Sequence, residues 1–294
     1  MILYFSATGN SKYIAETIAK SMNDECMSIV SCIRENRYCF ENEKVLGIVS
    51  PTYFWRLPRI VAMFLENIQM INCAYTFCVF SYGTTTGSVT HFTKKLMQKN
   101  NHMFDAYYSV MMPDTWTPMF DLTNQKKIDA KLSEGENQLQ HIITKIQTKT
   151  NGDFVKGKLP VCICVLPSFY MYHTERKTKH LSVNKDVCIG CGLCAKECPV
   201  QAIAMKDGYP VWIENECEMC LGCLHRCPMF AIQYGNGKTN TDNTEIQILQ
   251  YKKPMIFSNV IKLSTDDHWQ SLQKTLKPGM EQSFNQIVIP GLFF

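Results

Sequence analysis

The alternation of apolar and polar residues predicts strands and helices in turn over the first 150 residues. Apolar runs predict strands at 1–5, 25–30, 44–50, 75–81 and 103–112. The third and fourth runs are continuous, as expected for strands that are covered on both faces. Helices fit at 10–22, 58–69, 88–100 and 124–149. Five strands alternating with helices predict an α/β fold with a doubly wound, five-stranded parallel sheet.

The pattern changes after residue 152. We expect a first domain at 1–152, a connector at 153–181, a small cysteine-dense domain at 182–236 and a tail of unknown role at 237–294. In the connector, Cys162 and Cys164 alternate on "VCICV", which favours a strand over a metal site, because two ligands do not complete one. The tail contains a short amphipathic pattern at 266–277, "DDHWQSLQKTLK".

Composition and charge exclude some classes of function. The net charge of +4 over 294 residues is small, and no basic run is interleaved with aromatic residues, so we expect no nucleic-acid partner. The apolar segment at 159–172 contains two prolines and is shorter than the roughly 20 residues that span a bilayer. The first residues do not resemble a signal peptide, so a cytoplasmic protein that does not span the membrane is expected. Fifteen cysteines in such a chain favour metal or redox chemistry.

Eight of the cysteines form an internal repeat. The run "CIGCGLCAKECPVQAI" at 188–203 recurs 29 positions later as "CEMCLGCLHRCPMFAI" at 217–232. Three cysteines two residues apart wrap one iron–sulfur cube, and the fourth, before proline, binds the other cube. This rule predicts two 4Fe-4S clusters with crossed ligand sets. The first set is Cys188, Cys191, Cys194 and Cys227, and the second is Cys217, Cys220, Cys223 and Cys198.

The alternative for the repeat is a pair of structural zinc sites. Zinc is satisfied by two CxxC pairs and gains nothing from the third cysteine or the proline. The run therefore resembles the bacterial two-cluster ferredoxins over about 50 residues, with each ligand position matched. Other cysteines, such as Cys73 and Cys78, lie in or beside an apolar strand, where a thiol acts as a small hydrophobe.

The segment "SATGNS" joins the first predicted strand to the first predicted helix. The amides of a helix start and three hydroxyls can bind a phosphate without a cation, helped by the helix dipole. Such a neutral site suits a phosphate monoester that stays bound. The alternative is an ordinary helix start that is capped by Asn10 or Ser11.

Two further loops follow the third and fourth predicted strands. "SPTYFWRLP" at 50–58 carries three aromatic residues on which a flat ring could stack, and "SYGTTTGS" at 81–88 lets backbone amides approach a ligand. Taken singly, each segment has an alternative interpretation, as core aromatic residues for the first and as an ordinary turn for the second. In the strand order 2-1-3-4-5 all three loops meet at the switch point, where flavodoxin-like sheets hold FMN.

The first half of the chain therefore resembles a flavodoxin, and residues 1–236 resemble proteins that fuse such a domain to an α+β, bacterial-type two-cluster ferredoxin domain. The resemblance implies FMN and two 4Fe-4S clusters in an electron-transfer protein. It assigns the phosphate to Ser6, Thr8, Gly9, Asn10 and Ser11, one border of the ring to Thr52, Tyr53, Phe54 and Trp55, and the other edge to Ser81, Tyr82, Gly83, Thr84 and Gly87. The first domain is not strongly acidic, unlike many flavodoxins, and neither parent domain accounts for the tail.

Three functions are compatible with these features. The first is an intracellular electron carrier that couples one-electron carriers to two-electron flavin chemistry. The second is an FMN and iron–sulfur reductase of a small organic substrate, and the third is a redox-sensing interaction protein. No acid–base or nucleophile constellation is visible, and no second dinucleotide fingerprint, so no catalytic residue and no dedicated NAD(P)H domain are predicted. Expected partners are a ferredoxin-like donor, a reductase or a small-molecule acceptor, a homodimer is compatible with the sequence, and exposed clusters suggest an anaerobe.

Overall fold

The computed structural model describes residues 1–235, which belong to one compact unit. The amphipathic pattern at 266–277 and the rest of the predicted tail lie outside the described residues.

The first part of the chain is built on a parallel sheet with six strands in the order β2-β1-β4-β6-β7-β8. The strands are β1 (Ile2–Tyr4), β2 (Cys26–Ser28), β4 (Leu46–Pro51), β6 (Thr76–Tyr82), β7 (Ala106–Met111) and β8 (Gly152–Asp153). The order of the first five strands is the predicted 2-1-3-4-5. The predicted number of five is wrong by one edge strand, β8, whose two residues pair with Ala106 and Tyr107. A glycine and an aspartate carry no apolar pattern from which such a strand could be predicted.

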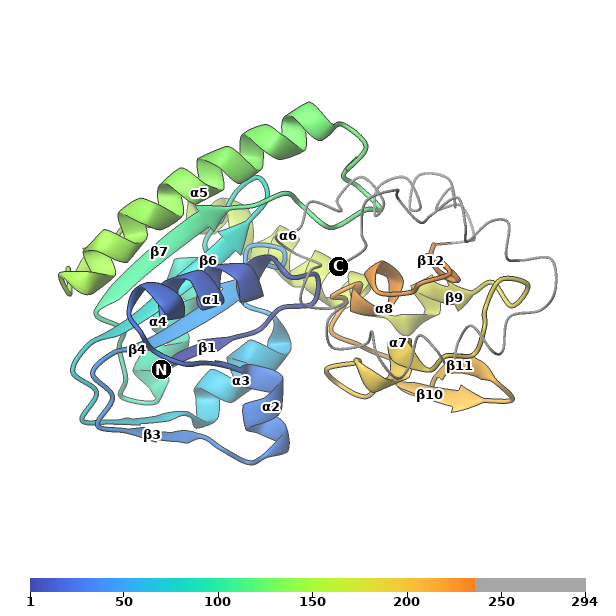
Figure 1. Cartoon of the computed structure of the whole chain (residues 1–294), viewed down its shortest axis with the longest axis horizontal. Helices are drawn as coiled ribbons and strands as arrows, with labels where there is room; N and C mark the ends of the chain where they lie inside the picture. The colour runs from blue at the N-terminus through green and yellow to red at the C-terminus, as the bar shows by residue number, and fades with distance from the viewer. Residues whose placement is uncertain (236–294) are drawn as a thin grey trace, which may run out of the picture. The chain divides into compact units, whose positions relative to one another are not determined.

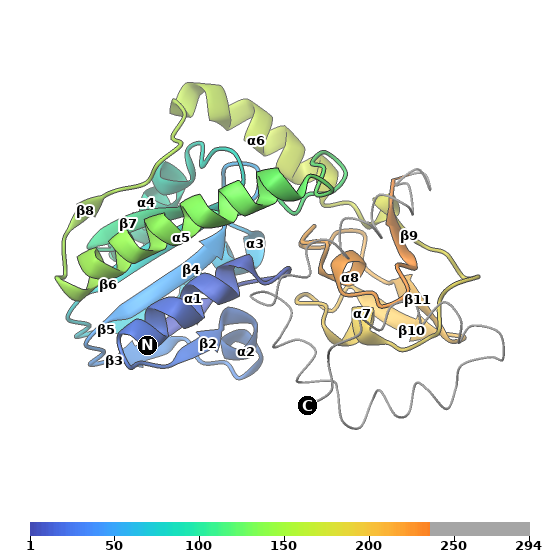
Figure 2. The same ribbon diagram turned by 45° about the horizontal axis from the view of Figure 1, so that its top comes forward.

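Helices cover both faces of this sheet (Figures 1 and 2). They are α1 (Asn10–Ser21), α2 (Ile29–Arg34), α3 (Arg59–Asn67), α4 (Val89–Lys99) and α5 (Gln125–Gln147). Successive side chains of a strand point to opposite faces. Accordingly, Phe77 and Val79 pack in one core with α1 and α5, whereas Cys78 and Phe80 pack in the other with α2, α3 and α4.

The second predicted strand is shorter than expected. Residues 25–30 were expected to be extended, but β2 ends at Ser28 and α2 begins at Ile29. The Ser28 hydroxyl accepts a hydrogen bond from the Val30 amide at 3.2 Å, which caps the new helix. A separate parallel pair, β3 (Cys39–Glu41) and β5 (Gln69–Ile71), lies beside this region and was not predicted.

The predicted connector contains a helix, α6 (Val161–Glu175), so the prediction that Cys162 and Cys164 lie on a strand is wrong. The helix begins directly after Pro160, at a position where a missing amide hydrogen costs nothing. Cys164 is buried and Cys162 is exposed. Apolar runs of this length are ambiguous between strand and helix.

The cysteine-dense part is small and held together by short elements. They are a 3-10 turn η1 (Thr178–His180), β9 (Leu181–Val183), α7 (Leu193–Lys196), β10 (Ile203–Lys206), β11 (Tyr209–Trp212), α8 (Gly222–His225) and β12 (Ile232–Tyr234). β9 pairs with β12, and β10 with β11, both antiparallel. Each half of the cysteine repeat contributes one short helix, α7 or α8.

Within the part of the chain that the structure describes, no helix has the length and apolar character needed to cross a membrane.

Gly47 in the central strand β4 provides a test of this packing. A Cβ there would lie 2.3 Å from Cζ of Phe77 and 2.9 Å from Cδ1 of Ile2. We expect Gly47→Ala to lower the free energy of unfolding by about 1–3 kcal/mol, since overpacking a core forces side chains off their rotamers. Thermal unfolding should show a lower Tm. The double variant Gly47→Ala/Phe77→Leu should recover part of the loss; an unchanged Tm in the single variant would contradict the close approach.

Candidate functional site

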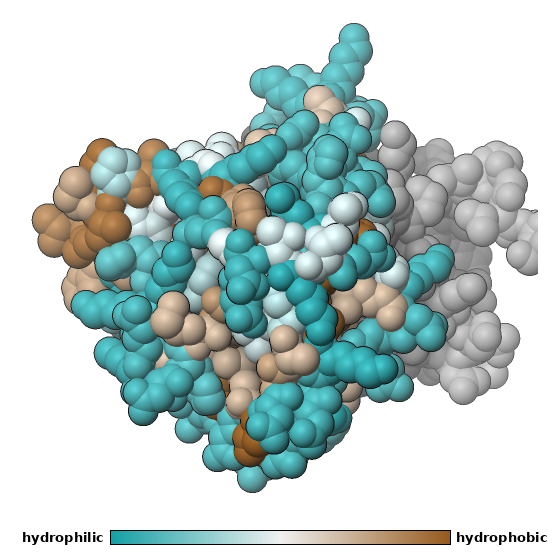
Figure 3. All heavy atoms as spheres, turned by 90° about the vertical axis from the view of Figure 1, so that its left-hand side faces the viewer, coloured by the Kyte–Doolittle hydropathy of each residue, from teal (hydrophilic) through white to brown (hydrophobic). Residues whose placement is uncertain are grey.

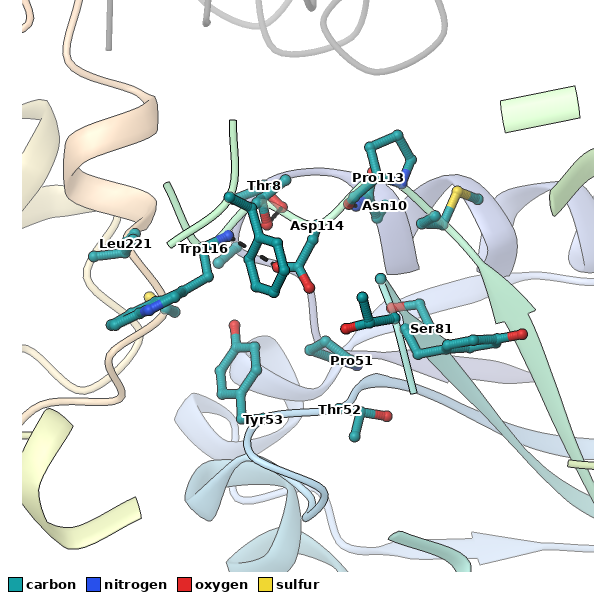
Figure 4. Close-up of a pocket in the computed structure, with 18 of the residues that line it drawn as sticks. Thr8, Asn10, Pro51, Thr52, Tyr53, Ser81, Pro113, Asp114, Trp116 and Leu221 are labelled. Atoms are coloured by element: carbon teal, nitrogen blue, oxygen red, sulfur yellow. Dashed lines mark hydrogen bonds between the residues drawn. The ribbon is translucent and has the colours of Figure 1, made fainter. Parts of the chain in front are cut away.

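The three predicted loops line one pocket of about 330 Å³ (Figure 4). It lies at the carboxyl ends of β1, β4 and β6, where ligands bind in open α/β sheets. The predicted residues that line it are Ser6, Thr8, Asn10, Ser11, Thr52, Tyr53, Phe54, Trp55, Ser81, Tyr82, Gly83 and Thr84. The predicted residues Gly9 and Gly87 are not among the lining residues and act instead on the shape of the loops.

The loop before α1 presents a helix start without a side-chain cap. Gly9 occupies the N-cap position with a φ of 106°, a conformation that glycine adopts without strain. The alternative of an ordinary cap by Asn10 or Ser11 does not hold, because both lie inside the helix. The side-chain Nδ2 of Asn10 donates to the Pro113 carbonyl at 3.0 Å, and the Ser11 and Ser81 hydroxyls are 2.9 Å apart.

The hydroxyls of this loop are held in place by neighbouring groups. Ser6 Oγ accepts from the Gly9 amide at 3.1 Å, and Thr8 Oγ1 lies 3.2 Å from Thr115 Oγ1. The first amides of an α-helix have no acceptor within the helix, and the helix dipole is positive at this end. The loop therefore offers preorganised neutral donors that fit a phosphate.

The aromatic loop after β4 is a tight turn. Tyr53 and Arg56 exchange backbone hydrogen bonds of 2.9 and 3.0 Å, and Phe54 and Trp55 between them have positive φ values. Trp55 Nε1 donates to Thr85 Oγ1 at 2.9 Å. Gly87 allows this contact, since a Cβ there would lie 2.2 Å from Trp55 Cγ. The left-handed residues carry backbone strain of the kind that is concentrated at functional sites.

One buried polar group in the pocket lacks a partner. The Thr52 hydroxyl is buried and forms no hydrogen bond with the described protein atoms. An unsatisfied buried hydroxyl costs about 1–3 kcal/mol, so a ligand with polar groups along its edge would recover that cost. The flavin ring has such an edge, and the residues present therefore fit FMN.

A fourth wall of the pocket, which was not predicted from the sequence, is the loop that follows β7. It contributes Asp114, Thr115, Trp116, Met119 and Phe120. Asp114 accepts from the Trp116 amide at 3.1 Å, and burial raises the pKa of its carboxyl group (Figure 4). The sequence does contain a signal for this wall, because the loop follows the carboxyl end of a predicted strand and contains aromatic residues.

The cysteines line two small cavities in the crossed sets that the repeat predicted. Cys188, Cys191, Cys194 and Cys227 line one cavity, which we call the outer quartet. Cys198, Cys217, Cys220 and Cys223 line the other, which we call the inner quartet. Each fourth cysteine therefore lies with the three cysteines of the other half of the repeat.

Backbone amides point at the sulfurs in a way that also repeats. The Ala202 amide donates to Cys198 Sγ at 3.3 Å, and the Ala231 amide donates to Cys227 Sγ at 3.2 Å. Such hydrogen bonds to sulfur tune the potentials of iron–sulfur clusters. Burial raises the pKa of Cys220 to about 12, so a thiolate there needs positive charge nearby, which iron supplies.

The spacing of the ligands bears on the zinc alternative. Within residues 1–235, no three His, Cys, Asp or Glu side chains converge closely enough to hold a single metal ion. Each quartet supplies four thiols around one cavity, which is the donor set of a 4Fe-4S cube.

The inner quartet reaches the flavin pocket. Met219, Cys220 and Leu221 line that pocket together with the sheet loops. His225 Nε2 lies 2.8 Å from the Thr115 carbonyl, which can only accept, so this nitrogen carries the proton. Burial lowers the pKa of His225 to about 4, so the ring is neutral at pH 7. His225 is therefore a buried, neutral hydrogen-bond donor to the loop that follows β7.

Comparisons with known proteins find two domains. Residues 1–139 match the family model of the flavodoxin domain, and residues 181–204 match that of the 4Fe-4S binding domain. An uncharacterized ferredoxin of Methanocaldococcus jannaschii is 42% identical over 57 residues, which are 18% of this chain and 31% of that protein. Ferredoxin-2 of Chlorobaculum tepidum is 40% identical over 53 residues, 16% of this chain and 86% of that protein.

Two further matches are a ferredoxin and a solved structure. A ferredoxin of Pyrobaculum islandicum is 31% identical over 64 residues, 21% of this chain and 60% of that protein. The chain thus spans less than two thirds of two of these three relatives. The Trp repressor binding protein of Bacillus subtilis is a structural match with 11% identity and a TM-score of 0.32, covering 51% of this chain and 99% of that one. A score this low adds nothing to the fold assignment.

Proposed function

The chain belongs to the proteins that join a flavodoxin domain to a 4Fe-4S ferredoxin domain, and we propose that it passes electrons between FMN and two 4Fe-4S clusters. FMN exchanges one or two electrons, whereas each cluster carries one, so a chain that holds both couples the two kinds of carrier. We place the FMN domain at 1–152 and the two-cluster domain at 182–236.

The observation that carries the proposal is the position of Cys220. This ligand of the inner quartet lines the flavin pocket, and no cysteine of the outer quartet does. We therefore assign the order outer cluster, inner cluster, FMN. The neighbours of Cys220, Met219 and Leu221, complete the pocket wall between the inner quartet and the flavin.

The remaining pocket residues bind and orient the flavin in this proposal. The amides and hydroxyls of residues 6–11 hold the phosphate. Tyr53 and Trp55 border the ring, and the free Thr52 hydroxyl bonds to its edge. The apolar wall excludes water from the ring and from Cys220.

An anaerobic titration of the reconstituted full chain tests this function. Reduced ferredoxin should bleach the flavin band, and NADH or NADPH alone should not. Bleaching by NAD(P)H alone, followed by reoxidation with a small organic substrate, would instead favour the reductase. Partner binding that changes with the oxidation state, without net electron transfer, would favour the redox sensor.

A further inference from the structure

A second hollow, away from the flavin pocket, lies between α3 and α4 and ends at α6. Its volume is about 270 Å³. Four cations line it, Arg56, Arg59, Lys95 and Lys99, together with apolar and aromatic side chains that include Phe92 and Tyr172. None of its lining residues is acidic. We call this hollow the basic groove.

Arg56 is held in a fixed orientation in the basic groove. Its guanidinium carbon lies 4.0 Å from the centre of the Phe92 ring, and its Nε donates to Ser168 Oγ at 2.9 Å. Ser168 is fully buried and donates its own proton to the Val165 carbonyl. Nε is thus used, while the terminal nitrogens have no carboxylate partner among the described residues. A preorganised arginine of this kind is suited to bind an oxyanion through two nitrogens.

The positive charge of the groove is poorly balanced. Lys95 and Lys99 are four residues apart on α4, an arrangement of like charges that weakens a helix. Neither forms an ion pair within residues 1–235. Arg59 lies 3.8 Å from Glu216, but this carboxylate also pairs with Arg176 and Lys177. An anion with more than one charge would relieve this repulsion.

The groove is separate from the flavin pocket, although the same two segments border both. In the turn after β4, Tyr53 to Trp55 face the flavin pocket and Arg56 faces the groove. In α6, Met171 faces the pocket and Tyr172 faces the groove. The FMN phosphate loop at 6–11 contributes nothing to the groove.

We propose that the basic groove is a binding site for a small organic phosphate whose apolar body lies between Phe92 and Tyr172. Arg56 binds the phosphate through its terminal nitrogens, and Arg59, Lys95 and Lys99 neutralise the remaining charge. Because α6 and the turn after β4 border both sites, the occupant lies next to the flavin without competing for it. The proposal for the basic groove holds whatever the direction of electron transfer and whatever its partners are.

Calorimetry on the full chain, loaded anaerobically with FMN and clusters, tests the site. FMN then occupies the other phosphate loop. Phenyl phosphate should bind with a stoichiometry of one, more tightly than inorganic phosphate or phenol alone, and more weakly as salt is added. Lys95→Gln/Lys99→Gln should weaken it at least about tenfold, or about 1.4 kcal/mol. The control Lys20→Gln/Lys44→Gln removes the same charge elsewhere and should bind as the unaltered protein does.

Two results would overturn the proposal. The first is no binding of phenyl phosphate, and the second is an equal loss of binding in both double variants while the flavin spectrum stays unchanged. For the first result, the outer face of α6 suggests a different role for the charges. This face exposes 77% of Leu166 and 70% of Tyr170 and forms an apolar cluster in Figure 3. Sedimentation with phosphatidic acid vesicles, without binding of phenyl phosphate, would assign the charges to a membrane surface instead.

Discussion

Replacing Cys198 by serine is expected to remove the inner cluster and to stop electron transfer to the flavin from the rest of the chain. Cys198 lies with Cys217, Cys220 and Cys223 around one cavity, although it belongs to the first half of the repeat. Iron should fall from about eight to about four per chain, since one of two 4Fe-4S clusters is lost. After electrons are introduced by a light flash under argon, the intramolecular phase of flavin reduction should disappear. This is the phase whose rate does not depend on the protein concentration.

The matched variant is Cys227→Ser, which makes the same change 29 residues later. It should also lose about four irons. The inner quartet is intact in this variant, so the intramolecular phase should persist while reduction by protein donors slows. FMN content, measured in both variants, reports whether the pocket has kept its structure. The opposite pattern, with the fast phase lost only in Cys227→Ser, would reverse the order of the two clusters.

Replacing Thr8 by glutamate is expected to abolish tight FMN binding but to spare riboflavin. Thr8 lines the pocket on the proposed phosphate loop. Two unit charges 4 Å apart repel by about 4 kcal/mol at an effective dielectric constant of 20. The Kd for FMN should therefore rise at least about 100-fold. Fluorescence quenching of each flavin on titration with the apoprotein measures both constants.

The control for this prediction is Thr8→Gln, which has the size of glutamate without its charge. Its Kd for FMN should change less than about tenfold, because only the contact between the Thr8 and Thr115 hydroxyls is lost. Riboflavin lacks the phosphate, so glutamate and glutamine should affect it alike. Equal weakening of FMN and riboflavin by Thr8→Glu would move the phosphate away from this loop.

The fold of the first part was predictable because its signals are local. The buried runs that form β4 and β6 are apolar at successive positions, as strands covered on both faces require. The amphipathic patterns of α1 and α5 likewise report which side faces a sheet. The prediction of a strand over 25–30 was wrong for the last residues, because Ser28 caps a helix in the middle of the run. The prediction of a strand in the α6 segment was wrong, because "VCICV" is compatible with the period of a strand and with that of a helix.

Some residues of the candidate site could likewise be predicted from local signals, and others could not. The loops at Ser6, Tyr53 and Ser81 could be found because each follows a strand whose end is evident. Asp114 and Trp116 follow a strand too, but their loop has no phosphate or glycine signature. Cys220 could be assigned as a ligand from spacing alone, but nothing in the spacing places it against the flavin loops.

By itself, the sequence determined the ligand types, their grouping into two halves and the alternation of strands and helices, because these depend on neighbours within a few residues. Only the tertiary structure decided that Cys220 of the inner quartet lines the flavin pocket, that His225 donates to Thr115, and that Arg56 faces a different hollow from Trp55. Those relations join residues that are far apart in the chain or on opposite sides of one turn. They depend on how packed surfaces meet, which local patterns do not encode.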